Sequence, residues 1–393
     1  MFDLATQLLA RRDAGLYRSR LTSSSPQGVR VVIDEREYLS FCSNDYLGLA
    51  SHPELVHSIQ DAAVRWGAGA GASHLLGGHS EIHHELEQAL ARFMGTQRAL
   101  LFSTGYMANL AVLSSLAGRG DVIYQDRLNH ASLIDGAQLS RASLKRYRHA
   151  DMQQLEGLLE QQHRGRKIIA SDGVFSMDGD LAPLSTLLAL CRHSESLWYI
   201  DDAHGVGVLG KTGRGIVELS SDRATDYSDG YLLSMCTLGK AMGSFGAFVA
   251  GSDEMIETLI QQGRSYIYTT ALPPVVAAAS LAALRISGAE PWRRDKLSML
   301  VDYFRAGCQQ RNIPLLPSST PIQPVLIGNN EQVQQLAERL QQQNLLVFAI
   351  RSPTVARGSE RLRVTLSASH EQADVDTLLD ALANAMNEIG NGP

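Results

Sequence analysis

The sequence predicts an α/β protein with a large, doubly wound and mainly parallel sheet domain, followed by a smaller C-terminal α/β domain. Short apolar runs alternate with stretches of helical periodicity, such as residues 150–163, ADMQQLEGLLEQQH. With 393 residues and 44% hydrophobic residues, the chain can bury a large core. Strands that are joined by helices in this way usually run parallel within one sheet, which gives the fold class.

The expected strands of the large domain are short and apolar. They are RALLF (98–102), DVIY (121–124), RKIIA (166–170), LWYI (197–200), YLLSM (231–235) and GAFVA (246–250). After about residue 275 the pattern changes to long helices and three further strands, PIQPVLI (321–327), LLVFAI (345–350) and RLRVTL (361–366). We therefore expect an N-terminal helix and arm over residues 1–45, a large domain over 46–275 and a small domain over 276–393.

Composition and charge exclude several classes of protein. The net charge of −6, with scattered Lys and Arg, argues against a nucleic-acid partner. Residues 1–20 have helical spacing and an early acid, unlike a signal peptide, and the apolar run 271–286 contains Pro-Pro and is too short to span a bilayer. The four cysteines form no C-x-x-C pair, which suits reduced thiols. We expect a cytoplasmic protein with no membrane segment.

Polar residues follow the expected strands, where open α/β sheets bind their ligands. Residues 103–106, S-T-G-Y, lie between a strand and a helix, so free backbone N–H groups there favour a phosphate. His130 follows the second strand, and residues 201–204, D-D-A-H, follow the fourth. Singly, such residues are more often caps and turn residues. Together they predict one pocket with a phosphate site, an imidazole and a carboxylate.

Lys240 is unusual in its surroundings. The chain has only five lysines, and this one lies in residues 233–246, LSMCTLGKAMGSFG, directly after an apolar strand. Burying an amine there is costly without a charge partner or a chemical role. The alternative is a lysine whose amine reaches solvent from a loop.

Two other motifs offer different functions. Residues 205–212, GVGVLGKT, satisfy the nucleotide-binding pattern G-x-x-x-x-G-K-[ST], but D-D-A-H separates them from their strand and G-R-G follows instead of a helix. His79, His83 and Glu87 have spacing that suits a metal, although residues 83–93 fit a helix that packs its Leu and Phe side chains. We expect neither a P-loop nucleotide site nor a metal site.

A lysine, an acid, an aromatic ring that can stack and a phosphate pocket are together what pyridoxal 5′-phosphate (PLP) requires. At this point a family resemblance appears. The segments that carry it are SNDYLGL (43–49), SDGVFSMDGD (171–180), DDAHGVG (201–207), TLGKAMG (237–243) and IRSPTVARGSERLRVTLSASH (350–370). In this order, over nearly the whole chain, they resemble the α-oxoamine synthases, which are PLP-dependent transferases of fold type I.

The resemblance implies roles around the cofactor ring. Lys240 would form the internal aldimine and later remove the Cα proton of the substrate. Asp201 would pair with the pyridinium nitrogen, and His130 would stack on the ring. His204 would hydrogen-bond the ring O3′, and Ser176 would make a further polar contact.

The resemblance also implies a phosphate site and a dimer. Gly105 and Tyr106 would bind the phosphate through backbone N–H groups, together with the Thr237 hydroxyl. Thr269 and Thr270, in YIYTTALPP, resemble the segment that reaches the phosphate from the partner subunit, which implies a homodimer.

Substrate contacts follow from the same resemblance. Arg351 would hold the amino-acid carboxylate, a task that suits a planar guanidinium. Asn44 is expected near the substrate, and Arg20 is a looser candidate for the far carboxylate of the acyl chain.

The family joins a small amino acid to an acyl thioester with loss of CO2. Asn44-Asp45 and the D-D-A-H motif at 201–204 are most similar to the acyltransferases that condense L-alanine with pimeloyl-CoA or pimeloyl-acyl carrier protein in biotin biosynthesis. Ser352 and Ala356 replace prolines that are usual in those enzymes, and Asp172 stands where they often have Glu. The alternatives are members of the 2-amino-3-ketobutyrate ligase or serine palmitoyltransferase type.

Overall fold

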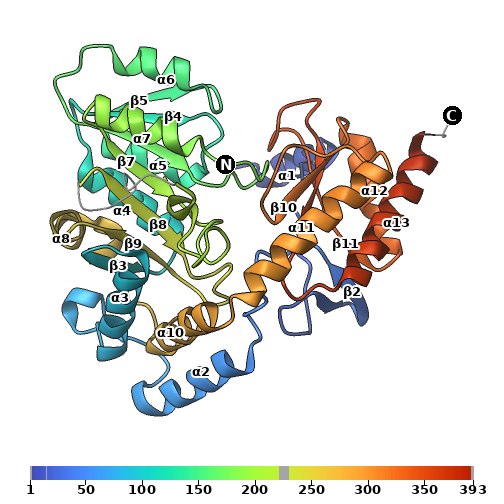
Figure 1. Ribbon diagram of the computed structural model, residues 1–393, viewed down its shortest axis with the longest axis horizontal. Coiled ribbons are helices and arrows are strands. Elements are labelled where there is room, and N and C mark those ends of the chain that lie inside the picture. Colours follow the sequence, from blue (N-terminus) through green and yellow to red (C-terminus); the bar gives the residue numbers. More distant parts are fainter. Residues whose placement is uncertain (1, 15, 221–229, 391–393) are drawn as a thin grey trace.

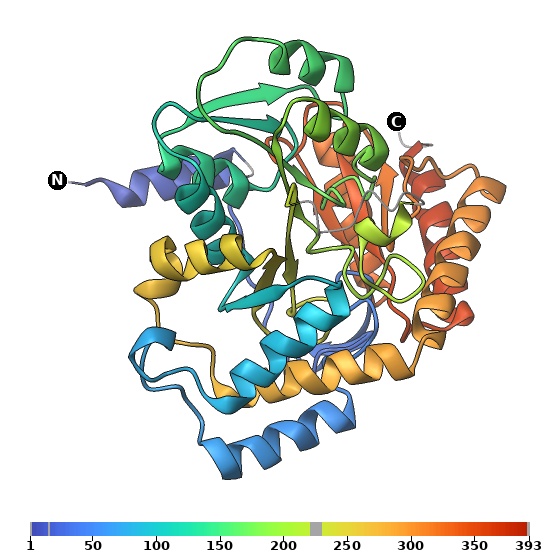
Figure 2. The same cartoon turned by 60° about the vertical axis from the view of Figure 1, so that its left-hand side comes forward.

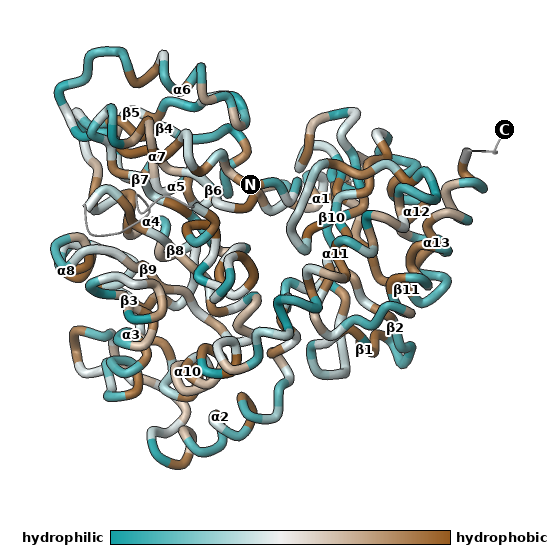
Figure 3. Tube along the Cα trace, in the orientation of Figure 1, coloured by the Kyte–Doolittle hydropathy of each residue, from teal (hydrophilic) through white to brown (hydrophobic). Residues whose placement is uncertain are grey.

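The computed structural model describes residues 2–14, 16–220 and 230–390, and within them the chain forms two parts that lie side by side (Figure 1). The larger part contains a seven-stranded sheet, and the smaller part contains two three-stranded sheets with the last helices of the chain. Apolar segments concentrate in the strands (Figure 3), and buried apolar side chains of the helices pack against them. This architecture confirms the predicted α/β fold with a large sheet domain.

The large sheet is mixed but mainly parallel. Its strand order is β3-β9-β8-β7-β6-β4-β5, and only β9 runs antiparallel to its neighbours. The strands are β3 (Arg98–Phe102), β4 (Val122–Asp126), β5 (Ser143–Tyr147), β6 (Lys167–Asp172), β7 (Leu197–Asp201), β8 (Leu232–Thr237) and β9 (Ala247–Gly251). The sequence patterns missed β5, an edge strand whose residues are mostly only half-buried or exposed, so it lacks a continuous apolar run.

Helices cover both faces of this sheet. Successive residues of one strand enter different hydrophobic clusters: Ile168 and Tyr199 pack with α4, whereas Ile169 and Ile200 pack on the opposite side. The helices of this part are α2 (Pro53–Trp66), α3 (Glu81–Met94), α4 (Gly105–Leu116), α5 (Ala131–Ser140), α6 (Met152–Leu159), α7 (Leu184–His193), α8 (Asp253–Gln262), α9 (Arg264–Ile267) and α10 (Pro274–Ala289), with short 3-10 helices η1 (His74–Leu76) and η2 (Ile216–Leu219). Burial of both faces explains why the strands read as continuous apolar runs.

The small part combines both ends of the chain. Strands β1 (Arg30–Ile33) and β2 (Arg36–Ser40) join β11 (Leu345–Leu346) in one sheet. A second, antiparallel sheet has the order β10-β13-β12. Its strands are β10 (Ile322–Leu326), β12 (Phe348–Ile350) and β13 (Arg361–Thr365), and the helices beside it are α11 (Trp292–Gln310), α12 (Asn330–Gln342) and α13 (Gln372–Gly390).

Two sequence expectations for this part need correction. LLVFAI is not one strand: it divides into β11 and β12, which belong to different sheets. The expected N-terminal arm contains two strands in addition to helix α1 (Leu4–Asp13): β1 pairs with β2, and β2 pairs with β11 of the C-terminal part of the chain. The three-way division at residues 45 and 275 stays a prediction. Helix α1 extends away from the rest of the molecule and buries none of its side chains (Figure 2).

Among the residues that the structure describes, no helix is both long and apolar enough to cross a membrane.

The structure does not support the alternative of a P-loop nucleotide site. Residues 205–212 form turns, and the next regular element is the four-residue η2 instead of a full helix. The Thr212 hydroxyl and backbone N–H bind the Glu218 carboxylate, so they are turned toward this chain's own acid. A phosphate-cradling loop needs a helix N-terminus at this point.

Candidate active site

A cavity of about 200 Å³ opens at the carboxyl ends of the parallel strands. Strand ends β6, β7 and β8 and the starts of α4 and α5 contribute to its walls. The lining residues are Gly105, Tyr106, Asn109, His130, Ser132, Asp172, Val174, Ser176, Asp201, Ala203, His204, Met235, Thr237 and Lys240. All the cofactor contacts expected from the sequence are therefore brought together here, except Thr269 and Thr270.

Lys240 lies in this cavity beside an imidazole. Its Nζ is 2.8 Å from Nε2 of His204, and the His204 Nδ1 is 2.6 Å from the hydroxyl of the fully buried Tyr46. Burial is the main cause that lowers the pKa of Lys240 to about 8, while the carboxyl groups of Asp201 and Asp172 oppose this change. Burial, followed by the nearby Lys240 charge, also lowers the pKa of His204 well below its usual range. The pair therefore consists of a partly deprotonated amine beside a neutral imidazole.

Asp201 is held in place by a hydrogen-bond network that the sequence patterns did not reveal. Its Oδ2 accepts a bond of 2.7 Å from Nδ2 of Asn109, and its Oδ1 accepts one of 3.1 Å from the Ala203 N–H. The Tyr199 hydroxyl donates to Asn109 Oδ1 at 2.6 Å. Asn109 is fully buried in helix α4. Its polar amide within the otherwise apolar run MANLAVL is the sequence feature that could have pointed to this role. It acts to fix the direction of the Asp201 carboxylate.

A second buried carboxyl group, Asp172, lies on the neighbouring strand. Asp172 and Asp201 are paired in register between β6 and β7. Burial and then the charge of Asp201 raise the pKa of Asp172 well above its usual range. The backbone N–H of His130 donates to both Asp172 oxygens, at 3.3 and 3.2 Å, and thereby connects the start of α5 to this strand. Asp172 thus helps to position His130 at the cavity wall.

The start of helix α4 offers backbone donors to the cavity. Helix α4 begins at Gly105, and Thr104 caps it by accepting a 3.2 Å bond from the Met107 N–H. The N–H groups of the first turn of a helix have no partner within the helix, so they suit an anion such as a phosphate. The Thr237 hydroxyl is close by, where it donates to the Gly246 carbonyl at 3.0 Å.

Arg363 brings the small part of the chain to the edge of this cavity. From β13, its Nε donates to the Ser176 carbonyl at 2.7 Å and its Nη2 donates to Asn44 Oδ1 at 3.2 Å. Asn44 Oδ1 also accepts a 3.2 Å bond from the Tyr46 hydroxyl, so these residues connect Arg363 with His204. The positive charge of Arg363 contributes to the lowered pKa of Lys240. The alternating pattern of RLRVTL predicted a strand, but it did not indicate that Arg363 would lie at the edge of the cavity.

The other expected substrate residues lie apart from the cavity lining that the described residues form. Arg351 follows β12 and is half-buried, and Arg20 is exposed in the N-terminal segment. Thr270 forms an isolated bridge with Ser73, and Thr269 precedes it. The roles expected for these four residues stay predictions.

The donor set of the cavity suits PLP. A Schiff-base amine, an acid with a fixed direction, a flanking imidazole and a helix N-terminus lie around one space. Residues 36–382 also match the family model described as aminotransferase class I and II. Fold and site together define a PLP-dependent enzyme of this class.

Known relatives narrow the family further. The chain is 52% identical to the 8-amino-7-oxononanoate synthase of Cellvibrio japonicus, over 98% of this chain and 96% of that one. It is 48% identical to the enzyme of the same name from Saccharophagus degradans, over 98% and 97%. The chain belongs to the 8-amino-7-oxononanoate synthase family, which is a family of acyltransferases.

Solved structures agree with this assignment. A serine palmitoyltransferase with PLP bound as an internal aldimine is similar, with a TM-score of 0.91, 28% identity and coverage of 98% of this chain and 97% of that one. The 8-amino-7-oxononanoate synthase of Francisella tularensis has a TM-score of 0.77 and 30% identity, over 90% and 98%. These comparisons confirm the fold type and PLP as the cofactor.

Proposed function

We propose that this chain condenses L-alanine with a pimeloyl thioester to give 8-amino-7-oxononanoate, CO2 and a free thiol, as a step of biotin biosynthesis. The names of its relatives, at about half identity over nearly the full length, support this reaction. The single structural observation that carries it is the position of Lys240, whose Nζ is 2.8 Å from His204 in the cavity that Asp201 also lines.

PLP, when bound, supplies an aldehyde carbon that forms a Schiff base with an amine and a ring that takes up the electron pair released at Cα. The residues of the chain provide the rest. Lys240 Nζ would be the amine that holds the cofactor aldehyde, and it would take up the Cα proton of the substrate. Because its pKa is lowered to about 8, a larger fraction of this amine is unprotonated at neutral pH than in an ordinary lysine.

Asp201 would hold a proton on the ring nitrogen of the cofactor. Its carboxylate is oriented by the Asn109 amide and the Ala203 N–H, so it does not have to reorganise when the ring is present. His130 and His204, which both line the cavity, are the candidates for contact with the cofactor ring. The N–H groups of Gly105 and Tyr106 would bind the phosphate, with the Thr237 hydroxyl turning from the Gly246 carbonyl to assist.

We place the amino-acid carboxylate at Arg363 in preference to Arg351. Arg363 already donates to Ser176 and Asn44, both of which were expected at the site, and its charge acts on Lys240. Since a guanidinium has five donors, it can keep these bonds and still bind a carboxylate. Arg351, which the sequence resemblance placed at the amino-acid carboxylate, then becomes a candidate for the acyl chain, and Arg20 stays a candidate for the distal carboxylate of that chain.

A homodimer would complete the site. Thr269 and Thr270 lie outside the cavity of their own chain, as expected if they reach the phosphate of a partner subunit. Tyr268, which directly precedes the two threonines, is 72% exposed, and Leu76, three residues after the Ser73 that pairs with Thr270, is 82% exposed. Exposed apolar side chains of this size suit a surface that a second copy covers. The acyl carrier would be coenzyme A or an acyl carrier protein.

The proposal is tested by supplying each amino acid to the holoenzyme with pimeloyl-CoA. L-alanine should perturb the visible spectrum of the bound cofactor more than glycine or L-serine, and mass spectrometry should detect 8-amino-7-oxononanoate. A stronger response to glycine would favour the 2-amino-3-ketobutyrate ligase type, and a stronger response to L-serine would favour the serine palmitoyltransferase type. Either result would reject the proposed substrate while keeping the family.

A further inference from the structure

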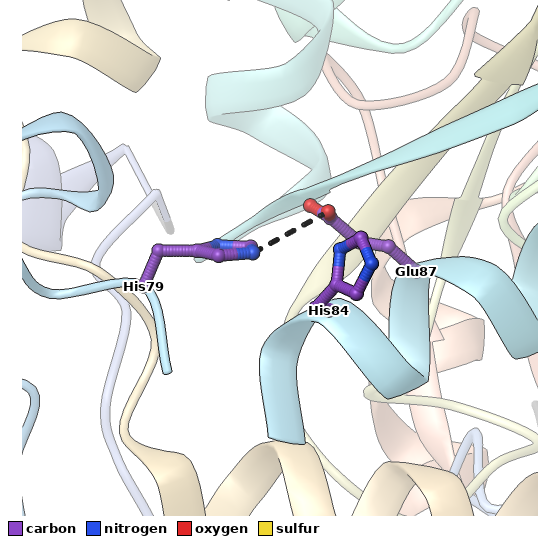
Figure 4. Close-up of side chains that lie close together, drawn as sticks. All are labelled: His79, His84 and Glu87. Atoms are coloured by element: carbon purple, nitrogen blue, oxygen red, sulfur yellow. Dashed lines mark ion pairs between the residues drawn. The ribbon is translucent and has the colours of Figure 1, made fainter. Parts of the chain in front are cut away.

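A cluster of histidines lies at the start of α3, outside the cofactor cavity. His79 precedes the helix, and His84 and Glu87 are less than one helical turn apart on it. One potential ligand atom from each of the three lies within 4.8 Å of the other two. In Figure 4 the carboxylate of Glu87 points toward the ring of His79, and the ring of His84 lies beside it. Three metal-binding side chains therefore converge on one place.

Neighbouring groups fix two of these side chains. The Glu87 Oε1 accepts a bond of 3.0 Å from the Leu101 N–H, which leaves Oε2 directed at His79 Nε2, 3.8 Å away. The His79 Nδ1 is 2.9 Å from Nδ1 of His74, whose ring stacks on Tyr266 with centroids 5.0 Å apart. If His79 donates its Nδ1–H to His74, its Nε2 lone pair is free for a metal. Metal-binding histidines commonly donate their second N–H in this way.

His83, which sequence spacing had grouped with His79 and Glu87, is occupied elsewhere. Its Nε2 donates to the Leu272 carbonyl at 2.5 Å, and its Nδ1 accepts from the Ser80 N–H at 3.0 Å. Both ring nitrogens are therefore in use. The structure replaces it with His84, which is exposed. The Nε2 of Gln88 lies 2.9 Å from the His84 Nε2, and the His84 ring lies edge-on to that of His79, with centroids 6.3 Å apart.

The side chains of the cluster are also suited to a cation. The Glu87 carboxylate is only 14% exposed, and its Oε2 faces the ring of His79. Two imidazoles and one carboxylate are ligands that zinc and related ions accept, with further positions left for water.

We propose that His79, His84 and Glu87 form a binding site for a divalent transition-metal ion of the zinc class. Metal–ligand bonds of about 2.0–2.2 Å place tetrahedral ligand atoms roughly 3.4 Å apart. Because the three ligand atoms lie within 4.8 Å of one another, they close by at most about 1.4 Å, which the exposed His84 can supply by a side-chain rotation. The ion links the turn before α3 to the helix and, through the Glu87 bond to Leu101, to the edge strand β3. This strand leads directly into the helix α4 N-terminus.

The test uses the holoenzyme without a polyhistidine tag, stripped of metal with a chelator and titrated with ZnCl2 by isothermal calorimetry. One ion per chain should bind, and the affinity should fall at least tenfold in His84→Ala and in Glu87→Gln. His57→Ala is the matched control, because His57 is an exposed histidine 3.4 Å from Asp61 that lies outside the cluster. Zinc should also raise the melting temperature of the wild type and of His57→Ala but not of His84→Ala.

Two results would overturn the proposal. One is the lack of stoichiometric zinc binding to the wild type. The other is binding that His84→Ala and Glu87→Gln both leave unchanged, as would occur if the ion bound the cofactor or scattered surface groups. Because His84 is exposed, its variant should fold and can decide the question even if Glu87→Gln does not.

Discussion

The two sides of the cofactor cavity are built differently. On the large-domain side, Asp172, Asp201 and Thr237 end adjacent strands whose register is fixed by parallel and antiparallel pairing. On the small-domain side, Arg363 meets the cavity edge through two hydrogen bonds, to Ser176 and to Asn44. The first side is positioned by a continuous sheet, whereas the second depends on how two parts of the chain pack. Chemistry at the cofactor should therefore depend on the first side, and recognition of the amino acid on the second.

We expect the largest effect from removing the amine of Lys240 on the large-domain side. We expect Lys240→Ala to lower kcat on the order of 10⁴-fold, because no other described side chain of the cavity offers an amine. Lys211→Ala is the control: this lysine is exposed in the turn segment 205–212 and should leave kcat unchanged. Thiol release from pimeloyl-CoA with L-alanine provides the measurement. Equal losses of kcat in the two variants would contradict the role assigned to Lys240 and would favour the alternative of a nucleotide site at residues 205–212.

Replacing the two arginines separately sharpens the comparison on the small-domain side. We expect Arg363→Ala to raise the KM for L-alanine about 10- to 100-fold, since hydrogen bonds to charged groups contribute about 1.5–3 kcal/mol. Arg351→Ala should affect the KM for the acyl donor more than that for L-alanine. Arg363→Lys keeps the charge but not the planar fork, so it should recover only part of the loss. A larger L-alanine effect at Arg351 would restore the role that the sequence first suggested.

Asn109 tests whether the sheet side needs its buried support. We expect Asn109→Ala to weaken PLP binding about tenfold, because Asp201 and the Tyr199 hydroxyl would lose their shared partner. Fluorescence titration of the apoprotein with PLP measures this directly. Asn109→Asp is a useful contrast, since it places a like charge beside Asp201 and should weaken binding further. PLP affinity that is unaffected in both variants would show that Asp201 is oriented without this amide.

The smallest expected effect concerns the turn that carries Ser176. His149 donates to Asp126 at 3.1 Å and to Asp180 at 2.8 Å. It therefore connects the end of β4 to Asp180, which lies four residues after Ser176. Burial opposes protonation of His149, but its bonds to Asp126 and Asp180 outweigh it and raise the pKa to about 10. A raised histidine pKa adds stability that is complete below pH 6.5 and is lost as the pH rises toward 10.

Accordingly, His149→Gln should lower the urea midpoint at pH 6, and the difference from the wild type should shrink by pH 10. The exposed His57→Gln serves as the control, with little change at either pH. A difference for His149→Gln that grows with pH would contradict the assigned charge state.

The same contrast explains what the sequence could predict. Lys240, Asp201 and His204 were found because short apolar strands and the residues that follow them are visible in the sequence, and parallel strands bring such residues to one edge. Asn109 and Asp172 were not assigned, since their roles arise from contacts between a helix and two strands. Arg363 could not be preferred over Arg351 without knowing how β13 docks on the turn at Ser176. Strand β5 was not predicted for a different reason: it lies at the edge of the sheet, where exposed positions interrupt the apolar run.

The most direct test of the central claim is to locate the bound cofactor. The purified holoenzyme should show a visible absorption band of Lys240-bound PLP, and borohydride should attach the cofactor permanently to the peptide that contains Lys240. Peptide mapping by mass spectrometry, with Lys240→Ala treated in parallel, gives the answer. The account predicts modification of that peptide in the wild type and none in the variant. A protein that takes up no PLP, or one modified at another lysine, would contradict it.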